Sequence, residues 1–387
     1  MAGTGLAGIE TRWAVSALFL ANGLVVGSWA PKLPAMMVRL DIGESVAGLL
    51  VLALGIGSIC LMPVFGALVA KRGSAHAVKL AAVLFTPSLI WISLAPTVWT
   101  VAIAVLVFGG LIGGMDVAMN ANAVAVERAR RRAIMSSCHG FWSLGGLAGA
   151  GAGGAAIQAV GEVAHAILVT LVVAVILAAA FPRLLRDSPQ GERAHQPIRL
   201  PRTPLPYLIG VMALASMIPE GAILDWAAVY LQREMGASLA VAGWGFAACA
   251  GTMAAMRFLG DGIRRRHGAV GTLRASTLVA MAGLALAGLA GSPAVALAGF
   301  GLAGIGIANM VPIAFSAAGN VPGLAQGVGL SVVTTMGYSG ILLAPGTIGF
   351  LAERIGFSAI YLGLSLLLLV PLLLSRLART ADFNENR

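Results

Sequence analysis

Twelve apolar runs follow one another along most of this chain, each about 18 to 25 residues long, the length at which a helix crosses a bilayer. They lie near residues 13–33, 46–70, 78–95, 98–121, 134–157, 163–181, 205–230, 239–259, 272–291, 293–316, 325–351 and 357–376. The sequence therefore predicts an all-α membrane protein with twelve transmembrane helices. Only 10% of the residues are charged and 59% are hydrophobic. This excludes a soluble domain, which carries roughly 25% charged residues.

A polar interval divides the runs into two sets of six. We expect an N-terminal six-helix half at residues 1–181, a cytoplasmic linker at 182–204 and a C-terminal six-helix half at 205–387. The first run could instead be a secretory signal peptide. We favour a retained helix, because Glu10 weakens the basic start and the bulky Trp29 stands beside the supposed cleavage site.

The basic residues predict the orientation, since cytoplasmic loops of membrane proteins retain positive charge. With the N-terminus inside, 21 of the 25 lysine and arginine residues fall on the cytoplasmic side. Both termini and the linker should then be cytoplasmic. The net charge of +10 does not indicate nucleic-acid binding, because the basic residues are dispersed between apolar runs.

An internal repeat emerges when the sequence is shifted by 195 residues. Gly73 then falls on Gly268, and each of the two follows a basic segment. The same shift places Gly145, Gly151 and Gly154 on Gly340, Gly346 and Gly349. Repeated halves are common in transporters, where they enclose a site near the middle of the membrane.

The segment GALVAKRG at residues 66–73 resembles the signature G-x-L-A-D-R-x-G-R-K of the major facilitator superfamily, with Ala70 in place of the aspartate. The second half has RFLGDGIR at residues 257–264 in the corresponding loop. This resemblance implies the major facilitator fold, with candidate gating residues Gly66, Arg72, Gly73, Asp261 and Arg264.

Four shorter stretches resemble the fucose-permease-like branch of bacterial permeases. They are WAPKLP at 29–34, DVAMNAN at 116–122, HGFWSLGG at 139–146 and EGAILDW at 220–226. The resemblance implies a multi-pass permease of the bacterial inner (cytoplasmic) membrane that works as a monomer. It also implies a small-molecule substrate and candidate contacts at Asn22, Trp29, Asn120, Trp142, Trp226 and Asn309. Helix packing, or an aromatic belt at the interface, is the alternative role for these side chains.

Acids inside apolar runs are the candidates for proton coupling, because ionisable groups in membranes usually face a bundle interior or a transport path. Asp116 shares a helix face with Asn120, and Glu220 lies mid-membrane with no basic partner nearby in sequence. Asp225 and His139 complete the set. Alternatively, Asp116 and His139 hold two helices together and Asp225 caps an interfacial end. Lys32 either attracts an anionic group or extends to the interface.

We expect a secondary transporter that moves a small polar solute, a sugar or related metabolite, by alternating access, with protons as the coupling ion. An exporter of amphipathic or drug-like compounds and a non-transporting membrane sensor are the alternatives. No metal-ligand cluster or nucleophile motif indicates an enzyme. We therefore expect no metal and no cofactor, and the bilayer and the solute as partners.

Overall fold

A computed structural model describes residues 8–130, 134–187, 201–321 and 328–381. Within these ranges the chain forms helices and no strand, as an all-α protein should. The elements are α1 (Ile9–Leu40), α2 (Glu44–Arg72), α3 (Ser74–Phe85), α4 (Ser88–Leu94), α5 (Val98–Arg130), α6 (Met135–Ala180), η1 (Phe181–Arg183), α7 (Leu205–Arg233), α8 (Leu239–Ala242), α9 (Trp244–Gly288), α10 (Pro293–Gly319), α11 (Val328–Leu367), α12 (Leu369–Leu373) and η2 (Leu374–Ala381).

Ten segments of the described chain are long and apolar enough to cross a membrane. Two of them are much longer than one crossing, with 47 residues in Ser137–Arg183 and 50 in Val332–Ala381. Each is broken by a glycine with non-helical angles, Gly161 in α6 and Gly356 in α11. The apolar runs of the sequence predict a boundary near each of these two glycines.

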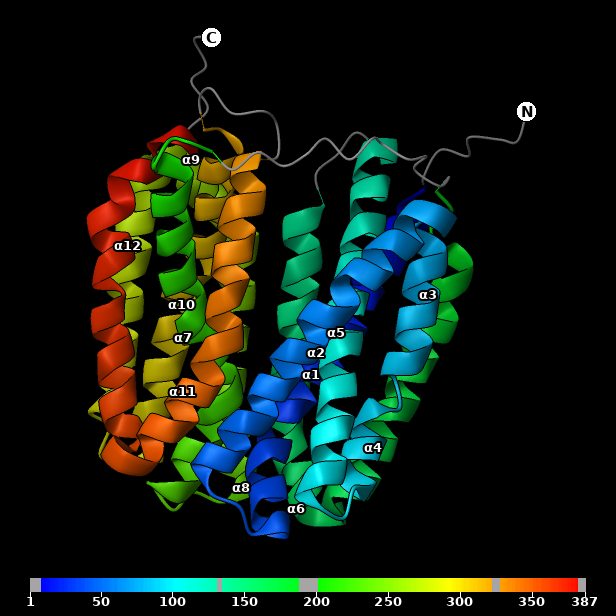
Figure 1. Cartoon of the computed structure of the whole chain (residues 1–387), viewed down its shortest axis with the longest axis vertical. Coiled ribbons are helices and arrows are strands. Elements are labelled where there is room, and N and C mark those ends of the chain that lie inside the picture. Colours follow the sequence, from blue (N-terminus) through cyan, green and yellow to red (C-terminus); the bar gives the residue numbers. More distant parts are fainter. Residues whose placement is uncertain (1–7, 131–133, 188–200, 322–327, 382–387) are drawn as a thin grey trace.

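The helices gather in two groups that lie side by side (Figure 1). We call α1 to η1 the N-half and α7 to η2 the C-half. Most of the predicted linker lies outside the described residues. We call one end of the molecule the terminal end: α1 begins there, with η1 beside it (Figure 1). The opposite end, where α1 turns into α2, is the distal end.

The backbone repeats at the spacing that the sequence predicts. The described residues with positive φ form three pairs, each separated by 195 positions: Asp41 with Gly236, Gly73 with Gly268, and Gly161 with Gly356. Their φ angles are 51° and 62°, 82° and 69°, and 85° and 78°. Gly73 and Gly268 mark the terminal end and the other two pairs mark the distal end. The two halves therefore turn at corresponding positions.

Glycine allows α1 and α6 to approach closely within the N-half. A Cβ atom on Gly23 would collide with the Trp142 carbonyl, and one on Gly145 would collide with the Leu20 carbonyl. Helices in membranes associate largely by such close packing, because lipid supplies no hydrophobic driving force between them.

The two halves make polar contacts with each other at the distal end, where their ribbons converge (Figure 1). Glu353 in α11 accepts hydrogen bonds from the Ser45 backbone and hydroxyl in α2, at 2.8 and 2.5 Å. Arg233 in α7 lies 3.7 Å from Glu44. The Ala240 amide donates to Gln158 at 3.2 Å. These contacts join helices that are far apart in sequence and tie the distal ends together.

Candidate functional site

Glu220, Arg257 and Ser143 form a polar chain between the two halves. Arg257 in α9 lies 3.3 Å from the Glu220 carboxylate in α7, and its other terminal nitrogen donates to Ser143 Oγ in α6 at 2.7 Å. Their side chains are mostly buried, with 14% of Arg257 and 22% of Glu220 exposed. Glu220 therefore has a basic partner that is 37 residues away. Arg257 connects the acid of one half to a hydroxyl of the other.

Asp116 and Asn120 lie on one face of α5, as their spacing predicts. Asn120 Nδ2 donates to the Asp116 carboxylate at 3.0 Å and to its backbone carbonyl at 2.9 Å. The carboxylates of Asp116 and Glu220 both lie close enough to Tyr338 in α11 to interact with it electrostatically. Tyr338 therefore lies near an acid from each half.

His139 and Trp142 lie at the start of α6 and face α1. The His139 ring packs against Phe19 with 5.2 Å between ring centroids, and the charge of Arg257 acts on it. Trp142 Nε1 donates to Asn22 Oδ1 at 2.8 Å. Asn22 and Trp142 are therefore brought together inside the N-half, and Asn22 Nδ2 has no hydrogen-bond partner among the described residues.

Trp29 and Asp225 meet across the two halves, near the distal end. Trp29 Nε1 donates to the Asp225 carboxylate at 3.2 Å, and both side chains are buried. Trp226 points elsewhere, because its ring packs against Phe357 within the C-half at 5.5 Å. Asn309 lines a separate cavity between α9 and α10. The predicted substrate contacts are thus distributed over at least three places.

The gating candidates lie at the terminal end. Arg72 contacts His76 at 3.3 Å, and Gly73 turns the chain into α3 with positive φ. Arg264 donates to Ser316 Oγ at 2.9 Å and to the Ala381 carbonyl. A Cβ atom on Gly66 would meet nothing within 4 Å. The side chain of Asp261 lies outside the described part of the structure.

The terminal end also uses an acid that the sequence did not single out. Asp187 accepts hydrogen bonds from the backbone amide and hydroxyl of Ser74, each at 2.9 Å, and so caps the start of α3. Asn122 donates to the same hydroxyl at 2.9 Å and to the Leu185 carbonyl at 3.0 Å. Asn122 therefore serves the terminal end and points away from Asp116.

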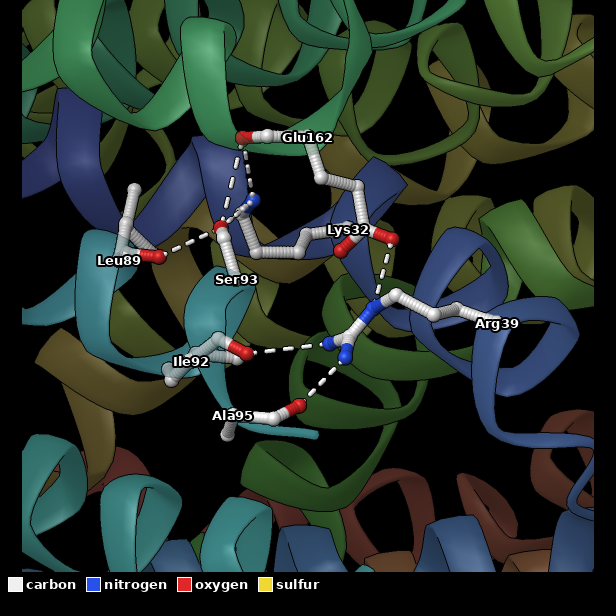
Figure 2. A network of polar contacts seen from close by, with 7 residues as sticks. All are labelled: Lys32, Arg39, Leu89, Ile92, Ser93, Ala95 and Glu162. Atoms are coloured by element: carbon white, nitrogen blue, oxygen red, sulfur yellow. Dashed lines mark hydrogen bonds and ion pairs between the residues drawn. The ribbon is translucent and has the colours of Figure 1, made fainter. Parts of the chain in front are cut away.

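Of the two roles that the sequence suggests for Lys32, extension to the interface is not the one observed. Its side chain is fully buried, and Nζ donates to Ser93 Oγ at 2.6 Å and to the Glu162 carbonyl at 3.2 Å. Figure 2 shows Arg39 beside it, where the guanidinium pairs with the Glu162 carboxylate at 3.1 Å. The network joins α1, α4 and α6 at the distal end of the N-half.

Arg257, Ser143 and Tyr338 are the members of the site that sequence reasoning missed. Arg257 counts with the basic loops in the charge distribution, although it lies inside the apolar run 239–259, where a cation is unusual. That position is a usable signal. Ser143 and Tyr338 give none, because hydroxyl groups are common in membrane helices.

Comparisons with known proteins agree with this architecture. The family model of the Major Facilitator Superfamily matches residues 15–345. The chain belongs to this superfamily. An uncharacterised MFS-type transporter of Yersinia pestis is 38% identical over 363 residues, which cover 94% of each chain. The protein is therefore a multi-pass membrane transporter and not an enzyme.

Solved structures share its fold. The nucleoside transporter NupG superposes with a TM-score of 0.71 at 13% identity, over 97% of this chain and 100% of that one. The fucose:proton symporter FucP of E. coli gives 0.67 at 16% identity, over 96% and 98%. Identities this low show the fold alone, and the fold is the one that the sequence motifs indicated.

Proposed function

We propose that this protein is a proton-coupled transporter of a small polar solute, in the range of sugars and nucleosides. The observation that carries the proposal is the chain from Glu220 through Arg257 to Ser143. It places an acid that can take up a proton beside a cation that also bonds to the other half. The solved structures with this fold include a nucleoside transporter and a fucose:proton symporter, which supports the solute class.

Proton uptake and movement of the halves share Arg257 in this mechanism. When Glu220 is ionised it holds Arg257 in its present position, 3.3 Å away. Protonation removes that attraction, because a neutral carboxyl no longer forms an ion pair. The guanidinium can then turn to another acceptor, such as a solute hydroxyl or carbonyl, and its bond to Ser143 changes with it. Coupling follows because Arg257 contacts both halves, so that protonation of Glu220 changes the contacts of Arg257 with each of them.

We propose that Asp116 and Asn120, with Tyr338, bind the polar groups of the solute. A carboxylate, an amide and a phenol provide both donors and acceptors, which a molecule with several hydroxyl groups requires. We assign Asp225, by contrast, to the distal gate because its hydrogen bond goes to Trp29 of the other half. His139, Trp142 and Asn22 pack α6 against α1 and support the site.

We further propose that the terminal end is cytoplasmic and that the protein lies in the inner membrane as a monomer. The positive charge of the terminal loops supports this orientation. The distal end is then the periplasmic gate, and the polar contacts between the halves at this end support a closed gate. Two six-helix halves, 1–181 and 205–387, rock around the site between them.

Proton flux into proteoliposomes tests the proposal. Intact protein is challenged with a panel of sugars and nucleosides, and proton entry and solute entry are both recorded. Glu220→Gln should abolish proton movement and leave solute exchange, because the amide cannot carry a proton. Arg257→Gln should reduce both. Glu10→Gln, at an exposed acid near the start of α1, is the matched control.

Two results would overturn the proposal. Solute-driven proton flux that persists in Glu220→Gln would show that this acid does not carry the proton. Flux of the solute without any proton movement in the intact protein would indicate facilitated diffusion or another coupling ion.

A further inference from the structure

A cavity of about 430 Å³ lies outside the proposed transport site, between the two segments of α9 and the middle of α10. Met256, Ile263 and Ile305 supply apolar wall, and His267, Thr272 and Asn309 supply polar groups. Ile263, His267 and Thr272 are close to Gly268, the glycine turn that marks the terminal end. The cavity therefore extends from the middle of α10 toward the terminal end.

Two buried polar groups of this cavity have no hydrogen-bond partner. Thr272 Oγ1 and Asn309 Nδ2 both lack one in the described structure, and their residues are only 3% and 8% exposed. A buried hydroxyl or amide without a partner costs free energy comparable to a lost hydrogen bond. Both groups can donate, and both residues line the same cavity, so an oxygen acceptor is the group that would satisfy them.

The turn at Gly268 explains why Thr272 has no partner. A threonine in a helix usually donates to the carbonyl four residues earlier, as Thr277 does to Leu273 at 2.7 Å. For Thr272 that residue is Gly268, whose φ of 69° and ψ of 167° lie outside the helical range. The turn thus leaves this hydroxyl, on a residue that lines the cavity, without its usual acceptor within the helix.

The surroundings of the cavity are those of a lipid surface with a positive border. Leu259 and Leu278, on the two segments of α9, are 59% and 53% exposed. Such large apolar side chains on a membrane helix face acyl chains. His267 lines the cavity and Arg266 precedes it in the chain, and both residues are exposed. Basic pockets between membrane helices on the cytoplasmic side are typical binding places for anionic lipid headgroups.

We propose that this cavity binds one anionic phospholipid. An ester carbonyl of the lipid accepts hydrogen bonds from Thr272 and Asn309, and an acyl chain lies along Met256, Ile263 and Ile305. The phosphate lies at Arg266 and His267. An ester is the acceptor that fits, because it reaches the apolar cavity on a chain that also fills it. A free phosphate would leave the apolar walls uncovered.

Native mass spectrometry of the full chain tests the site. Delipidated protein is titrated with dioleoyl phosphatidylglycerol, dioleoyl phosphatidylcholine and dioleoylglycerol. We expect one tight site for phosphatidylglycerol, with weaker binding of the other two. Thr272→Val and Asn309→Leu should each weaken it about 3- to 10-fold, the effect of one lost hydrogen bond. Arg266→Gln should weaken it similarly.

Matched controls separate the site from general loss of structure. Thr277→Val removes a hydroxyl five residues along the same helix that already has a partner. Lys71→Gln removes an exposed cation from the corresponding loop of the N-half. Both should bind the lipid as the intact protein does. Thermal melting without lipid shows whether each variant is folded, and the near-isosteric Thr272→Val keeps the test valid if Asn309→Leu fails to fold.

Three outcomes would overturn the proposal. Unchanged affinity in both Thr272→Val and Asn309→Leu would show that the lipid ester does not bind these two side chains. Equal binding of phosphatidylcholine, or unchanged affinity in Arg266→Gln, would remove the preference for an anionic headgroup. Equal binding of dioleoylglycerol would reduce the site to an unselective apolar cavity.

Discussion

At the scale of single residues, Lys32 places a charged group inside the N-half. Its ammonium is fully buried, and moving such a cation out of water is unfavourable unless nearby groups compensate. Ser93 Oγ and the Glu162 carbonyl accept hydrogen bonds from the ammonium, and the Glu162 carboxylate supplies a nearby negative charge (Figure 2). That carboxylate also pairs with Arg39. One acid therefore compensates two cations.

Glu162→Gln should accordingly destabilise the protein. The amide can still accept from Arg39, but both cations lose their negative neighbour. We expect a loss on the order of 1–3 kcal/mol, the range for hydrogen bonds to charged groups. Adding Lys32→Met should recover part of it, because the variant no longer buries an uncompensated cation. Unfolding in detergent of the two single variants and the double variant measures the coupling; strictly additive losses would contradict this account.

The residue scale also marks where sequence reasoning stops. Asp116 and Asn120 are predicted as a pair because a spacing of four fixes them on one helix face, and they do bond. The partners of Glu220 and Lys32 come from other helices, 37 and 61 residues away. Local periodicity carries no information about such contacts, because they depend on how helices rotate against one another.

At the scale of elements, the turns repeat in the backbone of the two halves, but different side chains form hydrogen bonds with the backbone near them. Arg39 donates to the Ile92 carbonyl at 3.0 Å in the N-half. The carbonyl 195 residues later, that of Ala287, accepts from Tyr230 at 2.7 Å. Glu234 corresponds to Arg39 and caps the amides of Phe357 and Ser358. The corresponding carbonyls near these helix ends are thus satisfied by an arginine in one half and by a tyrosine in the other.

Gly161→Ala should destabilise the protein through the backbone alone. A Cβ atom at this position would meet nothing within 4 Å, but φ is 85°, which side chains with a Cβ atom rarely adopt. We expect a loss of about 1–2 kcal/mol. Gly363→Ala is the control, since it also meets nothing within 4 Å but lies in a helix. It should be neutral or stabilising by up to about 1 kcal/mol. Equal effects on unfolding would refute the argument.

Asp41 provides a second test of the repeat. It has a φ of 51° where the C-half has Gly236, and aspartate tolerates this region better than most residues. Asp41→Gly should therefore change the unfolding free energy little, because relief of the backbone offsets the greater freedom of the unfolded chain. Asp41→Val should cost about 1–2 kcal/mol, since a branched side chain fits the left-handed region poorly. A valine variant as stable as the glycine variant would exclude backbone strain here.

The elements themselves are largely predictable. Apolar runs locate the membrane helices, and the shift of 195 residues pairs Gly73 with Gly268, which both turn with positive φ. The apolar runs also end and begin again around Gly161 and Gly356, but the sequence does not single out these two glycines as the breaks. Glycine is too frequent in this chain, with 51 residues, for one of them to be recognised as a break.

At the scale of the whole molecule, the two halves repeat in backbone but differ in polar groups. Lys32, Asp116 and Asn120 belong to the N-half, and the residues 195 positions later are Ala227, Val311 and Phe315. Glu220 and Arg257 belong to the C-half, and the residues 195 positions earlier are Val25 and Met62. The halves therefore combine a symmetric frame with an asymmetric set of polar groups. In the proposed mechanism, contacts that join the halves decide which end is closed.

Trp29→Phe should loosen the distal end. Phenylalanine keeps an aromatic ring near Phe108 but loses the Nε1–H that donates to Asp225, which leaves a buried carboxylate without that donor. The closed distal end then becomes less favourable by about 1–3 kcal/mol, or roughly 5- to 150-fold in its population relative to open states.

Spin labels measure this shift. Val38→Cys in α1 and Val241→Cys in α8 are exposed positions near the distal end of opposite halves, and the three native cysteines are replaced by alanine. Distances between the labels in proteoliposomes should gain a longer population in Trp29→Phe. Trp99→Phe, at a tryptophan that is 81% exposed on α5, should leave the distribution unchanged. If Trp29→Phe also leaves it unchanged, the bond between Trp29 and Asp225 does not hold the distal end closed, and the remaining contacts of Glu353 and Arg233 must suffice.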